Sequence, residues 1–294
     1  MKRILTILLT CLLLSGCSAP AAPVEIAATT LPVYEFTSRL CEGTPLSVTR
    51  LVTEEVSCLH DYSLNVRQVK AAEAAETVVI SGAGLEEFME DILPEGTAID
   101  ASTGISLITP EEHHHHHEEA EERHEGHHHA DDPHIWLSPA IATRMAENIC
   151  QGLSARYPEY EAVFDTNLKT LRQEFADLEH YGKQQLEDLS CREIITFHDG
   201  FAYFAESFDL EILRAVEEES GSEASARDLI ELIEEVEHHD LPAIFTEKSG
   251  SVSAAGIIAR ETGCGSFPLD MAMAGDSYFE AMYHNIDTIK EALG

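Results

Sequence analysis

The chain has 294 residues, 44% hydrophobic and 24% charged, which is the composition of a globular protein and excludes a disordered or fibrous chain. It carries 54 acidic residues against 18 Lys and Arg, a formal net charge of −36. Such a surface repels phosphate backbones, so nucleic acid is excluded as a partner, whereas cations are favoured. Sixteen histidines are a high number, and nine of them lie in one short stretch.

The N-terminus has the pattern of an export signal. Two basic residues precede an apolar run, residues 4–14, that is too short to span a bilayer of about 30 Å. The sequence Leu14-Ser15-Gly16-Cys17 resembles a bacterial lipobox, in which the cysteine is lipidated. The alternative is an ordinary signal peptide with a chance cysteine. We expect residues 1–17 to be a lipoprotein signal peptide and the mature chain to lie at the extracytoplasmic face of the cell membrane, anchored by lipid on Cys17.

Five cysteines remain beyond that signal: Cys41, Cys58, Cys150, Cys191 and Cys264. Their number is odd, so at least one cannot join an internal disulfide, and the pairing stays open. No C-x-x-C spacing occurs, which argues against a thiolate metal site.

Short β-rich runs alternate with helical stretches in the first half of the chain. Strands are expected at 24–28, 46–51, 77–81 and 98–100, and helices at 33–40, 66–75 and 139–156. This order predicts a parallel sheet covered by helices. After Pro158, apolar residues at helical spacing predict one long helix that ends near residue 189, about 45 Å in length.

The alternation then restarts. Strands are expected at 193–197, 211–216, 243–246 and 266–269, and helices at 201–208, 226–238, 252–262 and 277–293. The predicted fold is therefore α/β, with two Rossmann-like lobes, residues 18–157 and 190–294, each a parallel sheet flanked by helices. One long rigid helix, residues 158–189, joins them, and a ligand would bind in the cleft between the lobes.

Four candidate metal ligands fall in loops at the expected strand ends. His60 follows the second strand by a short loop, and His134 lies just before the helix that starts at Pro139. His198 and Asp270 each follow a strand directly. A lone histidine is usually a surface or hydrogen-bonding residue, but three imidazoles and a carboxylate placed together suit tetrahedral zinc. Glu247, at another strand end, is either a plain cleft-edge carboxylate or the hydrogen-bond partner of a ligand histidine.

Several motifs in this order resemble one known family. They are His60-Asp61-Tyr62-Ser63-Leu64, Asp132-Pro133-His134-Ile135-Trp136-Leu137-Ser138-Pro139, Phe197-His198-Asp199-Gly200-Phe201, Leu269-Asp270, and Gly275-Asp276-Ser277-Tyr278 followed by Asn285. The chain is similar to the metal-binding (cluster A-I) substrate-binding proteins of ABC importers, and the zinc-uptake branch fits best.

That resemblance implies two α/β lobes that hold a metal ion between them, with His60, His134, His198 and Asp270 as ligands. Manganese members tend to carry Glu at the position of His198, and imidazole-rich sites suit zinc. Some zinc members offer a Glu just before the first histidine, where this chain has Leu59, so the fourth ligand is open between Asp270 and water. Gly200 stands where Ala is more usual, and the sequence alone gives no reason.

The stretch Glu111–His129 carries seven Glu and nine His, and it has no apolar residue larger than Ala with which to build a core. The insert 111–132 is expected to be an acidic loop whose imidazoles bind zinc, copper or nickel weakly; the alternative is a solvated insert with no role. The histidines are His113, His114, His115, His116, His117, His124, His127, His128 and His129.

The sequence and the resemblance together predict a zinc-binding lipoprotein, not an enzyme, that acts as a monomer and delivers Zn²⁺ to an ABC importer permease and its ATPase. Within the same family, a manganese or broad-metal binder is the alternative. Outside the family, the alternatives are a surface zinc store and a zinc hydrolase, which would use three histidines and an open fourth position.

Overall fold

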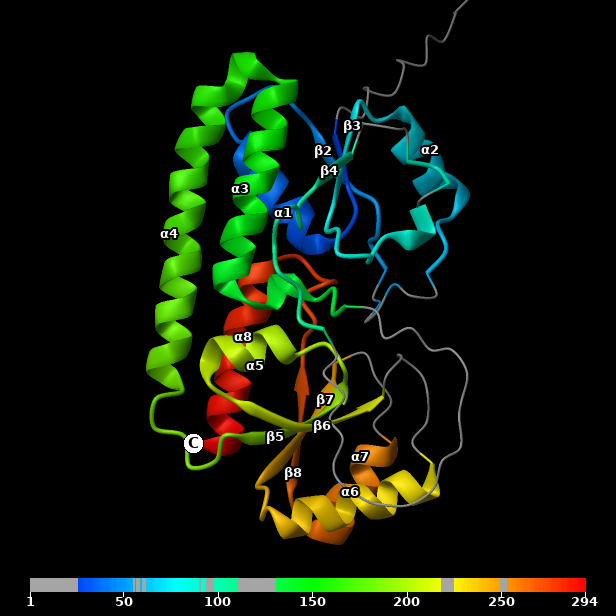
Figure 1. Ribbon diagram of the computed structural model, residues 1–294, viewed down its shortest axis with the longest axis vertical. Coiled ribbons are helices and arrows are strands. Elements are labelled where there is room, and N and C mark those ends of the chain that lie inside the picture. Colours follow the sequence, from blue (N-terminus) through cyan, green and yellow to red (C-terminus); the bar gives the residue numbers. More distant parts are fainter. Residues whose placement is uncertain are drawn as a thin grey trace, which may run out of the picture.

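The computed structural model describes residues 26–54, 56, 59, 62–89, 91–93, 98–109, 131–217, 225–248 and 253–294. Two four-stranded parallel sheets lie one above the other along the long axis of the molecule, and each has helices on both faces (Figure 1). The predicted α/β class with two lobes is confirmed. Cys17, Cys58, His60 and the histidines between 113 and 129 lie outside the described residues.

The N-terminal sheet has the strand order β2-β1-β3-β4. Its strands are β1 (Ile26–Ala28), β2 (Val48–Arg50), β3 (Thr77–Ile80) and β4 (Ala98–Asp100), and its helices are α1 (Leu31–Cys41), α2 (Val66–Ala74) and α3 (Pro139–Arg156). Side chains alternate along a strand. Ile26 and Ala28 therefore pack into the large core with α1 and α3, while Ala27 packs on the opposite face with Ala72 of α2.

The C-terminal sheet repeats this order as β6-β5-β7-β8. Its strands are β5 (Glu193–His198), β6 (Glu211–Glu217), β7 (Ala243–Glu247) and β8 (Gly265–Leu269), and its helices are α5 (Ala202–Phe208), α6 (Ala226–His238), α7 (Ser253–Thr262) and α8 (Tyr278–Leu293). Ile194 faces the large core with α5 and α8, whereas Ile195 and Phe197 face α6 and α7. The sequence predicted that His198 follows the strand directly, but in the structure it is the last residue of β5.

The long helix is shorter than predicted. A turn of 3₁₀ helix, Pro158–Tyr160, precedes α4, which runs over Glu161–Gln185. Beyond its end, Arg192 Nη2 donates to the carbonyls of Leu186 and Glu187, at 2.8 and 3.0 Å, and so satisfies groups that a longer helix would have used.

Helix α4 lies alongside both lobes (Figure 1), and it contacts α1 and α3 in one and α5 and α8 in the other. Its buried residues, Phe164, Leu168, Leu171, Phe175 and Leu178, belong to a single core that includes residues of both sheets. The two lobes therefore share apolar packing along the whole helix.

No helix within the described ranges is long and apolar enough to cross a membrane. Among the cysteines that the structure describes, no disulfide joins Cys41, Cys150, Cys191 and Cys264 to one another.

Candidate metal centre

The C-terminal lobe places a buried imidazole and a buried carboxylate side by side at one sheet edge. His198 ends β5 and Glu247 ends β7, the two neighbouring strands between which the strand order reverses. Ligands of open α/β sheets bind at such a point. The distance from His198 Nδ1 to Glu247 Oε1 is 3.2 Å, and the two residues are 2% and 5% exposed. The carboxylate therefore lies against the Nδ1 side of the ring.

The N-terminal lobe contributes a second imidazole, that of His134. It precedes a 3₁₀ turn, Ile135–Leu137, that leads into α3. One oxygen of Asp132 accepts from the His134 backbone N–H at 2.9 Å and lies 2.7 Å from Nδ1 of the ring. Sequence analysis assigned no role to this aspartate; its spacing, two residues before the histidine, was the available signal.

The two imidazoles meet between the lobes. His134 Nε2 lies 3.3 Å from His198 Nε2, and the rings are perpendicular, with an interplanar angle of 86°. When each Nδ1 beside its carboxylate neighbour carries the proton, both Nε2 atoms are unprotonated and offer their lone pairs within one small region. Such an arrangement suits a shared cation.

Hydrogen bonds from side chains to backbone carbonyls across the lobes fix the loops around this pair. Trp136 Nε1 donates to the carbonyl of Met271 at 2.8 Å, and the buried Tyr278 hydroxyl donates to the carbonyl of Trp136 at 2.8 Å. The loop that carries His134 is thus bonded to the loop after β8 and to the start of α8.

Gly200 lies against both imidazoles. A Cβ atom on it would be 2.7 Å from His198 Cδ2, 2.9 Å from His134 Nδ1 and 2.8 Å from Met271 Cε. These separations are shorter than van der Waals contact, so the missing side chain is what lets the rings take their places.

Asp270 follows β8 as predicted, but its oxygens already have partners. Oδ2 pairs with Lys248 Nζ at 2.9 Å and Oδ1 accepts from the Ala272 N–H at 2.8 Å, while Asn285 bonds its backbone. The part of the chain that the structure describes contains no cluster of three or more His, Cys, Asp or Glu able to hold a metal ion. His60 is not in that part, and Asp270 as a ligand stays a prediction.

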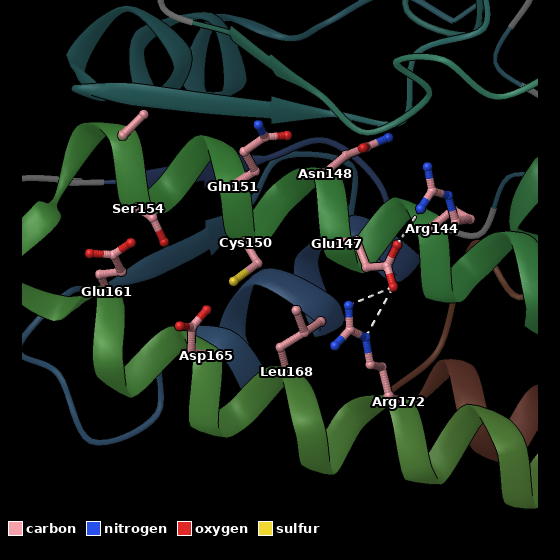
Figure 2. A pocket seen from close by; sticks show the side chains of 11 residues that line it. Arg144, Glu147, Asn148, Cys150, Gln151, Ser154, Glu161, Asp165, Leu168 and Arg172 are labelled. Carbon is pink, nitrogen blue, oxygen red and sulfur yellow. Dashed lines mark hydrogen bonds and ion pairs between the residues drawn. The ribbon is translucent and has the colours of Figure 1, made fainter.

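A separate groove of about 550 Å³ lies between α3 and α4 (Figure 2). Glu147 forms ion pairs there with both Arg144 and Arg172, each at 2.7 Å, and the carboxylates of Glu161 and Asp165 also line the groove. No histidine lines it, and Cys150 is its one thiol. It therefore lacks the imidazoles that meet between the lobes.

Residues 26–292 match the family described as zinc-uptake complex component A, periplasmic, or ZnuA. The chain belongs to this family. The match spans both sheets and α4, and the resemblance inferred from the motifs is confirmed. The ZnuA family consists of uptake components and not of enzymes, as the motifs implied.

Individual relatives agree with this assignment. The high-affinity zinc uptake system protein ZnuA of Bacillus subtilis is 27% identical over 283 residues, which cover 92% of this chain and 88% of that protein. The zinc-binding lipoprotein AdcA of Streptococcus pneumoniae is 28% identical over 282 residues, 91% of this chain but 55% of AdcA. The chain thus spans about half the length of the AdcA relatives that it matches. A crystal structure of ZnuA, 27% identical, superposes with a TM-score of 0.78 and covers 92% of this chain and 100% of that one.

Proposed function

We propose that the chain captures Zn²⁺ in the cleft between its lobes and delivers it to an ABC-type importer. The observation that carries this proposal is the distance of 3.3 Å between His134 Nε2 and His198 Nε2. In a tetrahedral site with Zn–N bonds of 2.0–2.1 Å, two ligand nitrogens are about 3.3 to 3.4 Å apart. The pair therefore has the spacing of two zinc ligands, one from each lobe.

The choice of zinc over manganese rests on the donor set. Both placed donors are imidazoles, which suit zinc, whereas manganese favours carboxylate and carbonyl oxygens. His60 is proposed as the third ligand. Asp270 or a water molecule would be the fourth, and Asp270 would first have to give up its ion pair with Lys248.

The cellular setting is proposed from the sequence and from the relatives. AdcA of S. pneumoniae is named a lipoprotein, and the sequence of this chain that ends at Cys17 resembles a lipobox. We place the mature protein at the extracytoplasmic face of the cell membrane, attached by lipid. It would act as a monomer that passes zinc to a permease driven by an ATPase.

A zinc titration by calorimetry of the mature chain tests the site. His134→Ala and His198→Ala each remove a proposed ligand, so each should lower zinc affinity at the tight site by more than about 100-fold. Removing a hydrogen-bond partner of a ligand already lowers metal affinity by about 10- to 100-fold. His180→Ala, at an exposed position of α4, is the matched control and should bind as wild type does. A tight site that survives His198→Ala, or manganese that binds as tightly as zinc, would overturn the proposal.

The histidine-rich insert is proposed as a source of additional, weaker zinc sites. Its nine imidazoles have no predicted core to join, so deletion of residues 111–129 should leave the fold and the tight site intact. The weaker zinc equivalents should disappear from the titration. Loss of the tight site on deletion would instead identify a primary ligand among those histidines.

A further inference from the structure

Three chain segments converge on the buried hydroxyl of Tyr203. This residue lies in the first turn of α5, five positions after His198, and is 1% exposed. Its oxygen accepts from the backbone N–H of Ile108 at 2.9 Å and donates to the backbone carbonyl of Asp132 at 2.9 Å. The Asp132 N–H in turn donates to the carbonyl of Ile108 at 2.9 Å. The three groups form a closed ring of hydrogen bonds.

The ring requires a neutral hydroxyl, since only that form can both donate and accept. Burial raises the pKa of Tyr203 to about 12, so the proton stays on the oxygen throughout the physiological range. A buried backbone group that loses its hydrogen-bond partner costs free energy of folding. The hydroxyl therefore fixes the positions of the two backbone segments, at Ile108 and Asp132, that meet there.

Asp132 connects this ring to the metal centre. Its backbone belongs to the ring, and its side chain holds both the backbone N–H and Nδ1 of His134. Tyr203 itself extends from the segment that begins with His198. A single hydroxyl therefore joins the segment that carries one imidazole to the residue that orients the other.

We propose that Tyr203 is a positioning residue for zinc capture: it fixes Asp132, and through Asp132 the imidazole of His134, relative to the segment that carries His198. The inference rests on the proposed function, because it takes the two imidazoles as zinc ligands. Groups that orient metal ligands typically change affinity by about 10- to 100-fold when they are removed. Tyr203 contacts Asp132 and not the imidazole itself, so removing its hydroxyl should lower zinc affinity by about tenfold, the lower limit of that range.

Tyr203→Phe tests the inference because it removes the hydroxyl and keeps the aromatic side chain. We expect zinc affinity to fall about tenfold. We also expect the visible spectrum of the cobalt-substituted protein to change, since that spectrum reports ligand geometry and would not respond to a loss of stability alone. Tyr181→Phe is the matched control: its hydroxyl bonds to Asp287 at 2.6 Å on the exposed side of α4 and α8, and both readouts should stay as in wild type.

A double-mutant cycle with Asp132→Ala locates the route. If Tyr203 acts through Asp132, Tyr203→Phe should have little further effect on zinc affinity once Asp132 is gone. Equal effects in both backgrounds would overturn the route. Unchanged affinity and cobalt spectrum in Tyr203→Phe would overturn the inference, even with a lower melting temperature. These results differ from a failure of the proposed function, in which the wild-type chain shows no tight site or His134→Ala keeps it.

Discussion

The two lobes share one strand order, yet they differ in what they place where that order reverses. In the N-terminal lobe this point lies between β1 and β3, and a buried carboxylate, that of Glu86, lies there. Its carboxylate accepts from Thr29 Oγ1 at 2.6 Å, the Ser81 N–H at 2.8 Å and the Gly82 N–H at 2.9 Å. All three donors come from its own lobe.

In the C-terminal lobe the same point presents His198, whose Nδ1 faces Glu247 and whose Nε2 faces His134 of the other lobe. A buried group whose partners all lie within one lobe stabilises that lobe and offers nothing to a ligand. A buried imidazole with one nitrogen directed across the cleft can bind one. The architecture therefore supplies two equivalent positions, and the local donors and acceptors decide which of them becomes a site.

The largest expected effect is on the stability of the fold, and it comes from Glu86, where the strand order of the N-terminal lobe reverses. Glu86→Ala leaves three donors without their acceptor, and unsatisfied buried groups cost about 1–3 kcal/mol each, so the free energy of unfolding should fall by about 3 kcal/mol or more. Zinc affinity of the folded protein should be unchanged. Urea denaturation and a zinc titration measure the two quantities, and Glu87→Ala, an exposed neighbour, is the control. A large loss of zinc affinity would show that the two points are not independent.

The same glutamate predicts a pH dependence of stability. Burial raises its pKa from the ordinary value near 4.5 to about 7, despite the three donors that lower it. The folded state therefore binds the proton more tightly than the unfolded state, and the associated stability is present at low pH and lost as the pH rises through about 7. Comparison with Glu86→Gln isolates this contribution: the difference in unfolding free energy, wild type minus variant, should fall by about 3 kcal/mol between pH 4.5 and pH 8. A difference that is flat across this range would contradict the raised pKa.

Sequence reasoning predicted most elements and the two histidines, His134 and His198, that the structure brings together, because these depend on local signals. Pro139 in the first turn and Ser138 as the N-cap define the start of α3, and the prediction of 139–156 matches the structure. His198 was found because it comes at the end of an apolar run. These features need no knowledge of the distant chain.

The features that were missed depend on contacts between distant segments. The predicted long helix was extended toward residue 189 because apolar spacing continues to the buried Leu186, whereas the carbonyls beyond the helix end are bonded by Arg192. Glu86 follows a turn, Gly82-Ala83-Gly84, in which all three residues have positive φ, so it reads in the sequence as part of a surface loop. Nothing local indicates that Thr29 meets it.

Where the strand order of the C-terminal lobe reverses, the expected effect of a substitution is on zinc binding. Glu247→Ala removes the carboxylate that lies 3.2 Å from His198 Nδ1 and frees the ring to rotate or change tautomer, so zinc affinity should fall by about 10- to 100-fold. Glu247→Gln keeps an acceptor oxygen and should recover part of the loss. Glu261→Ala, on the exposed face of α7, is the control. Calorimetry with zinc measures all three, and wild-type affinity in Glu247→Ala would remove the distinction between the two lobes.

The smallest expected effect concerns the space between the imidazoles. Gly200→Ala places a methyl group within 2.9 Å of His134 Nδ1 and within 2.7 Å of His198 Cδ2, so the rings must move apart or Met271 must withdraw. Inserting a methyl group into a filled site costs about 1 kcal/mol or more, which corresponds to a loss of about fivefold in zinc affinity if the cost falls on the bound geometry. Gly256→Ala in α7 has no atom within 4 Å of the added methyl and should leave affinity unchanged. If Gly200→Ala binds zinc as tightly as wild type, Met271 has absorbed the methyl, and the 3.3 Å spacing of the imidazoles does not depend on Gly200.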